Sequence, residues 1–241
     1  MMHPPLADPV SFTALAAWCD GIMAPDRPCE ADDPAGVWRV GRPEVRAVGL
    51  LLESWPGVAA WVETERLDAI IVHRPWQLPL DGLGEVGVLA YHLTFDERLT
   101  VGHNLWLAAR LGIIEPEEFG WKEGRPIGML GEISATPFAA LVAMVGQTFG
   151  GLDATVPGRT PVVTRMAVAG AMTDRLVREV AAQGADLYLT GQRRAPARAA
   201  VEATGIGVVA VGHARAERWG MRLLAALLSE RWPSLRVQKS S

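Results

Sequence analysis

Residues 67–75 read LDAIIVHRP, and residues 86–93 read VGVLAYHL. In both stretches the apolar residues follow one another almost without a break, which is typical of a strand buried on both faces of a parallel sheet. Comparable strands are expected over residues 45–52, 162–169, 185–189 and 206–211. Because stretches of helical periodicity separate these strands, the sequence predicts an α/β fold of layered, mixed or parallel sheets with flanking helices.

The helical stretches have recognisable ends. Ser11 is suited to cap a first helix that runs to about Asp20, and glycines follow several of the others. Residues 24–44 are rich in Pro, Asp and Gly and predict a loop with at most one short strand, and the charged segment 121–134 predicts a turn between short strands. The expected helices cover residues 12–20, 55–65, 99–111, 137–149, 174–183, 195–203 and 214–231.

A weak internal repeat is visible. In each half an apolar strand is followed by a histidine and, after three intervening residues, by an acid: His92 and Asp96 in the first half, His213 and Glu217 in the second. We therefore expect a single folded unit over residues 1–241, made of two interlocked α/β halves of roughly residues 1–125 and 126–241 that are related by duplication.

Composition narrows the class of protein. Of the 241 residues, 49% are hydrophobic and 21% charged, as in a folded soluble chain, and the net charge of −4 argues against a broadly basic nucleic-acid binder. A local basic patch remains compatible with that charge. The N-terminal residues have no signal-peptide pattern, and no run of apolar residues is long enough to cross a membrane, so we expect a cytoplasmic protein.

Histidines and acids at strand ends are the residues best suited to chemistry. His73, His92 and His213 end or follow apolar strands, where an α/β sheet usually opens to ligands. Together with Asp96 and Glu217 they offer imidazole and carboxylate groups, which suit zinc, manganese, iron or nickel. Simpler roles stay open: each histidine could be structural, Asp96 could cap a following helix, and Glu217 could be a first-turn acid favoured by the helix dipole. His103 lies in an expected helix and is interpreted as structural.

These motifs resemble a known family. The stretch HRP after one strand, H-x-x-x-D after the next, GHN in the following helix, ADLYLTGQ, and GHARAERWG near the C-terminus are similar to the Nif-three-like family. This is the dinuclear metal-centre hexamer family often labelled GTP cyclohydrolase I type 2. The resemblance runs from about residue 45 onward and is to the short form, without an inserted middle domain.

The resemblance implies roles for particular residues. His73 matches the first histidine of the family's His-His-Pro motif, Asp96 matches the aspartate that bridges the metals, and His213 and Glu217 match the closing ligands. His92 matches a histidine beside the site and is interpreted as a residue that supports the ligands or as a proton shuttle, rather than as a ligand. The resemblance also implies one or two divalent metal ions per chain and a hexameric toroid of identical chains.

The sequence departs from the family pattern in three places, one of which is a glycine-rich segment reduced to Ala169-Gly170-Ala171. Arg74 stands in place of the second histidine of His-His-Pro, and Gln192 stands in place of the glutamate of a TGE segment. A guanidinium stays protonated and has no lone pair to offer a cation. One of the two metal positions therefore lacks a ligand.

Arginines would surround the metal if the sheets close as the family implies. They are Arg74, Arg193, Arg194 and Arg215, and a ring of them would suit a phosphate or carboxylate ligand. The alternative is that they are ordinary solvated arginines. Trp76 and Trp219 lie next to the expected ligands and could stack on a ring, although packing is the preferred interpretation.

Two functions follow from these features. The first is a metal-dependent hydrolase acting on a nucleotide or phosphoester, with GTP as the first substrate to test and His92 moving the proton. The second is a non-catalytic hexameric metal-binding scaffold or an adaptor that binds protein or nucleic acid. Arg74 favours the second somewhat, because a site with one strong metal position is a poorer two-metal catalyst.

Overall fold

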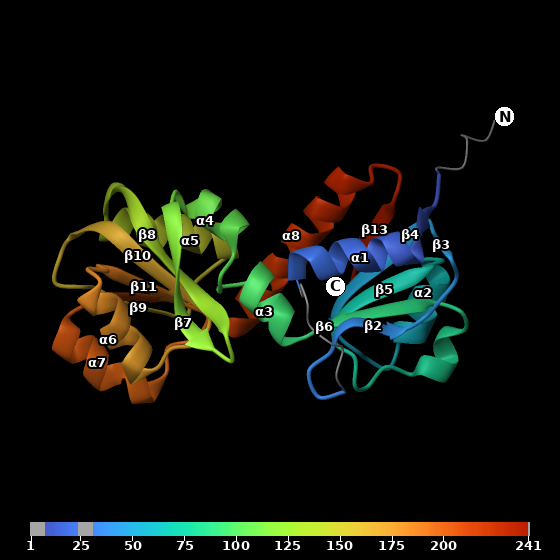
Figure 1. Cartoon of the computed structure of the whole chain (residues 1–241), viewed down its shortest axis with the longest axis horizontal. Helices are drawn as coiled ribbons and strands as arrows, with labels where there is room; N and C mark the ends of the chain where they lie inside the picture. The colour runs from blue at the N-terminus through green and yellow to red at the C-terminus, as the bar shows by residue number, and fades with distance from the viewer. Residues whose placement is uncertain (1–7, 24–30, 241) are drawn as a thin grey trace. The chain divides into compact units, whose positions relative to one another are not determined.

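The computed structural model describes residues 8–23 and 31–240 (Figure 1). Its contacts group the chain into two compact units: unit 1 takes the chain up to Phe95 and again from Met221, and unit 2 is Asp96–Gly220. The boundary expected near residue 125 falls at the first residue of strand β8 (Arg125–Pro137), inside unit 2. His3 and Cys29 lie outside the described residues.

Unit 1 is built on a five-stranded sheet with the strand order β13-β4-β5-β6-β2. The first four strands are parallel, and β2 is antiparallel to β6 at the edge. A short antiparallel pair, β1 with β3, lies outside this sheet. The strands are β1 (Val10–Ser11), β2 (Ala35–Arg39), β3 (Glu44–Val45), β4 (Ala47–Glu53), β5 (Ala69–Arg74), β6 (Gly87–Tyr91) and β13 (Arg236–Lys239), and a 3-10 helix η1 (Leu80–Leu83) precedes β6.

Helices α1 (Phe12–Met23) and α2 (Val58–Thr64) cover opposite faces of this sheet. Val58 of α2 belongs to the same core cluster as Val88 of β6. On the other face, a Cβ at Gly87 would lie 2.3 Å from the ring of Phe12, so α1 approaches β6 closely there. Gly87 and Val88 are consecutive residues of β6 and point to opposite faces of the sheet, so α1 and α2 lie on opposite faces. The hydroxyl of Ser11 accepts the N–H of residue 14 at 3.0 Å, as expected for a cap, although α1 extends beyond Asp20.

Unit 2 is built on a six-stranded sheet with the order β7-β8-β10-β11-β12-β9. Only β10, β11 and β12 run parallel, so the sheet is mixed. The strands are β7 (Ile114–Lys122), β8 (Arg125–Pro137), β9 (Ala154–Val156), β10 (Val162–Ala169), β11 (Leu187–Thr190) and β12 (Gly207–Ala210). The helices within unit 2 are α4 (Leu105–Leu111), α5 (Phe138–Phe149), α6 (Asp174–Ala182), η2 (Ala195–Ala197) and α7 (Arg198–Thr204). Two helices cross the boundary between the units: α3 (Leu93–Leu99) and α8 (His213–Arg231).

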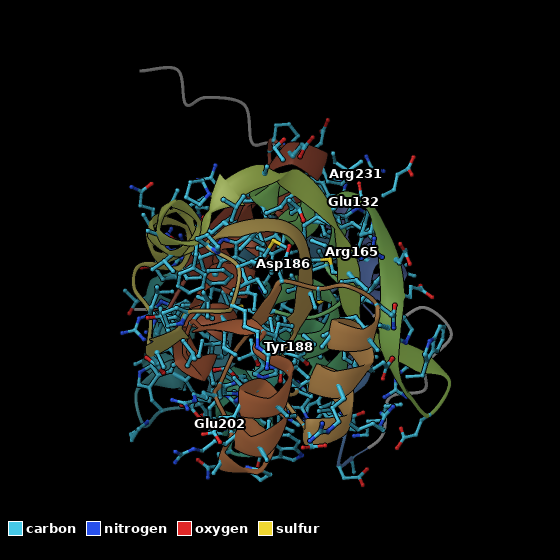
Figure 2. All side chains as sticks on the ribbon, turned by 90° about the vertical axis from the view of Figure 1, so that its left-hand side faces the viewer. Glu132, Arg165, Asp186, Tyr188, Glu202 and Arg231 are labelled. Carbon is cyan, nitrogen blue, oxygen red and sulfur yellow. The ribbon has the colours of Figure 1, made fainter. Side chains whose placement is uncertain are left out.

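The same strand order occurs in both units. In unit 1 β4-β5-β6-β2, and in unit 2 β10-β11-β12-β9, have three parallel strands and one antiparallel edge strand. An aspartate precedes the second strand of each set and accepts a backbone N–H of the first strand. Asp68 accepts the N–H of Ala47 at 3.1 Å, and Asp186 accepts that of Arg165 at 3.2 Å; Figure 2 labels Asp186 and Arg165. Each unit therefore contains the same order of three parallel strands and one antiparallel edge strand.

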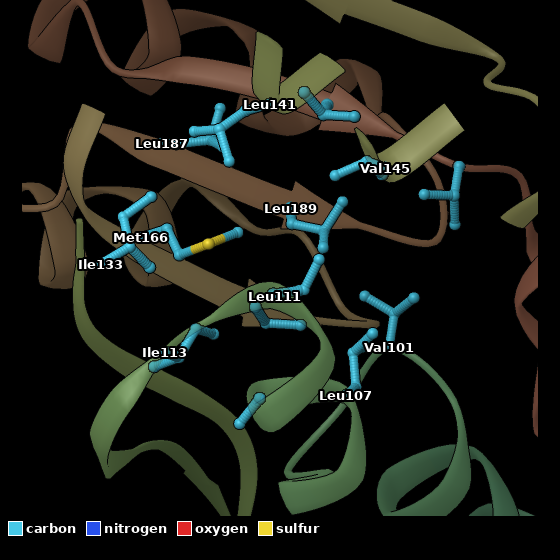
Figure 3. Packing of buried hydrophobic residues seen from close by; sticks show 14 of the residues in the cluster. Val101, Leu107, Leu111, Ile113, Ile133, Leu141, Val145, Met166, Leu187 and Leu189 are labelled. Carbon is cyan, nitrogen blue, oxygen red and sulfur yellow. The ribbon is translucent and has the colours of Figure 1, made fainter. Parts of the chain in front are cut away.

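The six-stranded sheet has a hydrophobic core on each face. On one face, α4 and α5 pack against the sheet through residues such as Leu111, Val145 and Leu189, as Figure 3 shows. On the other, α6 and α7 pack against it through Val177 and Val201. The unit is thus a sheet between two helical layers, as the alternation of strands and helices predicts.

One expected helix is wrong. Residues 99–111 do not form a single helix: α3 ends at Leu99, and α4 begins at Leu105 after a turn. The turn is tight, because a Cβ at Gly102 would lie 2.3 Å from the carbonyl oxygen of Glu97. Asn104 then caps α4 by accepting the N–H of Leu107 at 3.0 Å.

The segment 121–134 also differs from expectation, because it belongs to a long hairpin of β7 and β8 rather than to short strands. Elsewhere most expected elements form with ends shifted by a few residues; α2, for example, begins at Val58 instead of residue 55. Across the described parts of the chain, no helix has the length and apolar character needed to cross a membrane.

Candidate metal centre

His73 lies near the end of β5 and is fully buried, with 0% of its surface exposed. Its Nδ1 lies 3.0 Å from the backbone carbonyl oxygen of Tyr91 on the neighbouring strand. A carbonyl oxygen only accepts hydrogen bonds, so Nδ1 must carry the hydrogen and the lone pair is on Nε2. This tautomer is the one that leaves Nε2 ready to ligate a metal, with the backbone fixing the ring.

His92 follows β6 and lies beside His73, with 5.1 Å between the ring centroids. Its Nδ1 is 3.5 Å from Oδ1 of Asp33, and the ring of Trp76 meets it edge-on at a centroid distance of 5.0 Å. Burial lowers the pKa of His92 below its ordinary value; His73 and Arg74 lower it further, and Asp33 opposes them. The lowered pKa favours the neutral imidazole, which is the form that can accept a proton.

Asp96 lies in the first turn of α3 and is partly buried. The helix begins at Leu93, before Asp96, so the alternative that Asp96 caps the helix is wrong. The neighbouring residue Phe95 has its ring 5.0 Å from that of His73. Asp96 is thus joined by a single peptide bond to a residue in contact with the expected ligand on β5.

His213 and Glu217 lie on α8, one helical turn apart. His213 Nε2 is 3.0 Å from Glu217 Oε1, and the side chains are 57% and 5% exposed respectively. Helix α8 starts at His213, so Glu217 lies beyond the first turn, and the interpretation as a first-turn acid is wrong. A glutamate this buried needs a partner, and the imidazole is one.

The two histidine–acid pairs are not equivalent in the repeated strand order. Ala69 pairs with Gly87 in unit 1, and Leu187 pairs with Gly207 in unit 2. Counting five residues on from each glycine, His92 corresponds to Gly212, and His213 lies one residue later.

Three of the expected ligands form a group that could hold a metal ion: His73, Asp96 and Glu217. Imidazole with two carboxylates is a donor set that zinc, manganese or iron accepts. The residues present therefore fit a divalent cation.

The arginines differ in their surroundings. Arg74 is the last residue of β5 and is partly buried, whereas Arg193 and Arg194 are exposed after β11. Arg215 is paired with Asp153 and also donates to the carbonyl of Val211 at 3.3 Å, so its charge is already compensated.

Residues outside the ligand set have structural contacts. Trp219 packs on Phe149, at 5.5 Å between ring centroids, within the core of unit 2, as the packing interpretation predicts. His103 lies in the turn between α3 and α4, where Arg98 donates to its Nδ1 at 2.8 Å, and Glu118 lies 3.7 Å from its Nε2. This position agrees with a structural histidine.

Asp33 is the residue near the site that the sequence did not single out. It lies in the Pro/Asp-rich segment before β2, where an aspartate is ordinary for a loop. The only local signal was a pair of aspartates followed by a proline directly before a strand.

Comparisons with known proteins agree on one family. The family described as Duf34/NIF3 (NGG1p interacting factor 3) matches residues 83–241. A protein of Pseudomonas aeruginosa named "GTP cyclohydrolase 1 type 2 homolog" is 30% identical over 219 residues, which cover 83% of this chain and 85% of that protein. A protein of the same name from Neisseria meningitidis serogroup B is 27% identical over 175 residues; the match covers 73% of this chain and 65% of that relative, which is less than two thirds of its length.

Solved structures share the fold. Reduced HcgD from Methanocaldococcus jannaschii superposes with a TM-score of 0.73 at 16% identity, covering 97% of this chain and 98% of the other. The Bacillus cereus protein related to NIF3 superposes with a TM-score of 0.71 at 13% identity, covering 98% of both chains.

Proposed function

Because the chain belongs to the Duf34/NIF3 family, we propose that it holds a divalent metal ion on the grouped residues His73, Asp96 and Glu217, and that His213, which lies outside this group, completes the ligand set. We propose further that it is a metal-dependent hydrolase of a nucleotide or phosphoester. The observation that carries the proposal is the grouping of His73, Asp96 and Glu217, whose ligand atoms lie within 4.8 Å of one another, with the His73 ring held by its Nδ1 at 3.0 Å from the Tyr91 carbonyl oxygen.

The chemistry assigned to the chain follows from its own side chains. A divalent ion, when bound, lowers the pKa of a water molecule and polarises a phosphoryl or ring-carbon centre. Burial lowers the pKa of His92, and His92 would accept the proton that the attacking water loses. Arg74, Arg193 and Arg194 would hold the anionic part of the substrate.

The metal site is tested by elemental analysis of the purified, dialysed protein. We expect about one zinc, manganese or iron per chain, and at least a tenfold loss of affinity in His73→Gln and Glu217→Gln. His103→Gln and Glu118→Gln are matched controls, because they remove the same groups outside the expected ligand set. Equal metal content in the site variants and the controls would contradict the site.

The activity is tested with a panel of nucleotides and phosphoesters, beginning with GTP because the curated relatives carry that name. We expect turnover that depends on added metal and that Asp96→Ala abolishes. Turnover that survives this substitution, or none in the whole panel, would refute the hydrolase.

Arg74 supports a second candidate function, a metal-binding scaffold without catalysis. It occupies the position after His73 where the resembled family has a ligand, and it cannot take that role. Arg74→His tests this directly. A rise from one bound ion to two, with turnover appearing only in the variant, would favour the scaffold for the natural chain.

We propose that the chain assembles into a homo-hexamer, on the strength of the family resemblance. Light scattering coupled to size exclusion should then give a mass about six times that of one chain. A monomer at micromolar concentration would contradict this.

A further inference from the structure

The residue next to His92 that has no assigned role is Asp33. Its carboxylate is largely buried, at 14% exposure, and Oδ1 accepts the N–H of Leu93 at 3.1 Å. The same oxygen lies 3.5 Å from Nδ1 of His92. Asp33 therefore meets both the imidazole and the start of α3.

The segment around Asp33 fixes His92 through several contacts. The backbone N–H of His92 donates to the carbonyl of Pro34 at 2.9 Å. The indole N–H of Trp76 donates to the carbonyl of Ala31 at 2.7 Å, and the Trp76 ring meets His92 edge-on. Residues 31–34 thus fix the backbone of His92 and its ring neighbour Trp76, and they place the Asp33 carboxylate 3.5 Å from the buried Nδ1, which forms no hydrogen bond of ordinary geometry with the described residues.

We infer that Asp33 is a positioning residue, which keeps His92 in the tautomer with hydrogen on Nδ1 and the lone pair on Nε2. A carboxylate only accepts hydrogen bonds, so the ring nitrogen facing it is favoured as the one that carries hydrogen. The lone pair on Nε2 is then the group that takes the proton from the attacking water. Only this catalytic consequence rests on the proposed function; the tautomer itself does not.

The tautomer is measured by two-bond proton–nitrogen correlation spectra of protein labelled with ¹⁵N-histidine, at about pH 8, where histidines of ordinary pKa are neutral. The His92 signals are assigned by their loss in His92→Gln. We expect a protonated Nδ1 in the parent protein and a shift towards the other tautomer in Asp33→Ala. Asp32→Ala, which removes an exposed neighbouring carboxylate, should leave the spectrum unchanged.

The inference is overturned if His92 carries its hydrogen on Nε2 in the parent protein, or if Asp33→Ala leaves the tautomer unchanged. Asp33→Ala also removes the acceptor for Leu93, and if it fails to fold, Asp33→Asn takes its place. The neutral amide still accepts the Leu93 N–H, and it should shift the tautomer population in the same direction but to a smaller extent. An unchanged tautomer in Asp33→Asn would therefore also overturn the inference.

Turnover gives a second readout. Where GTP hydrolysis is measured, Asp33→Ala should lower kcat roughly ten- to a hundredfold with KM unchanged, while Asp32→Ala leaves both constants unchanged. The two proposals can be refuted separately. Absence of bound metal would refute the proposed function without affecting the tautomer result. An unshifted tautomer in the Asp33 variants would refute only the role of Asp33.

Discussion

The two equivalent aspartates of the repeated strand order should contribute unequally to stability. Asp68 accepts two backbone N–H groups, from Arg46 at 2.8 Å and Ala47 at 3.1 Å. Asp186 accepts two backbone N–H groups and, in addition, the hydroxyls of Thr160 at 3.3 Å and Thr164 at 2.9 Å. At about 1 kcal/mol for each partly exposed bond, Asp68→Ala should cost about 2 kcal/mol and Asp186→Ala about 4 kcal/mol.

The assay combines urea unfolding of the whole chain with amide hydrogen exchange, since exchange reports each unit separately. Asp186→Ala should increase exchange in residues 162–169, and Asp68→Ala should increase it in residues 45–53. Asn variants keep an acceptor oxygen and should lose about half as much. The reasoning is refuted if Asp68→Ala costs as much as Asp186→Ala, or if both cost less than about 0.5 kcal/mol, the usual limit for neutral surface changes.

The same contacts make the contribution of Asp186 to the free energy of unfolding depend on pH. Burial raises its pKa, but the hydrogen bonds from Thr164, Arg165 and Thr160 outweigh burial, so the net pKa is lowered. The stabilisation is therefore complete above the unfolded pKa of about 3.9 and is lost as the pH falls from there through the lower folded value. Asp186→Asn should remove that part of the acid dependence.

Three further outcomes are expected. Burial and then Arg98 lower the pKa of His103, so unfolding free energy should fall as the pH drops below about 6.5, and His103→Gln should flatten that curve in urea titrations. A saturating divalent ion at a hundred times its Kd should stabilise the protein by about 2.7 kcal/mol in thermal unfolding, and Glu217→Gln should reduce this gain. Gly87→Ala should cost about 1–3 kcal/mol because its Cβ would lie 2.3 Å from Phe12, with Phe12→Leu recovering part of the loss in the same assay.

The buried strands could be predicted from the sequence because their signal is local. Residues 162–169 were expected as a strand and form β10 over the same range. Its last four residues, 166–169, form an apolar run that is fully buried, as expected for a strand covered on both faces. In contrast, β13 (Arg236–Lys239) was missed, because its residues RVQK carry no apolar run, and the strand is defined by pairing with β4 far away in the sequence.

The start of α3 shows why helix ends were harder to predict. The helix begins at Leu93, whose N–H is accepted by Asp33, sixty residues earlier. No residue near Leu93 reveals this cap. The apolar spacing through residues 99–111 was regular enough to predict a helix across the Gly102 turn, where the close approach to Glu97 requires the chain to bend.

The residues of the candidate metal centre could be predicted from the sequence, but their contacts could not. His73 stands out because it ends an apolar strand, and Glu217 because it follows His213 at the spacing that separates Asp96 from His92; the structure finds both buried. The tautomer of His73 depends on Tyr91 of the next strand, and the orientation of His92 depends on Asp33. These contacts arise because strands pair and loops pack against them, and the hydrophobic periodicity of the sequence does not indicate which residues meet in this way.

The discontinuous course of unit 1 has a consequence for how the protein is made. Ribosomes deliver the chain from its N-terminus, and domains tend to fold as soon as their residues have emerged. Unit 2 is a single continuous stretch, whereas the sheet of unit 1 gains its edge strand β13 only when residues 236–239 exist. The sheet of unit 1 is therefore completed only after all of unit 2 has been synthesised. A nascent chain halted before residue 236 leaves β4 with an open edge.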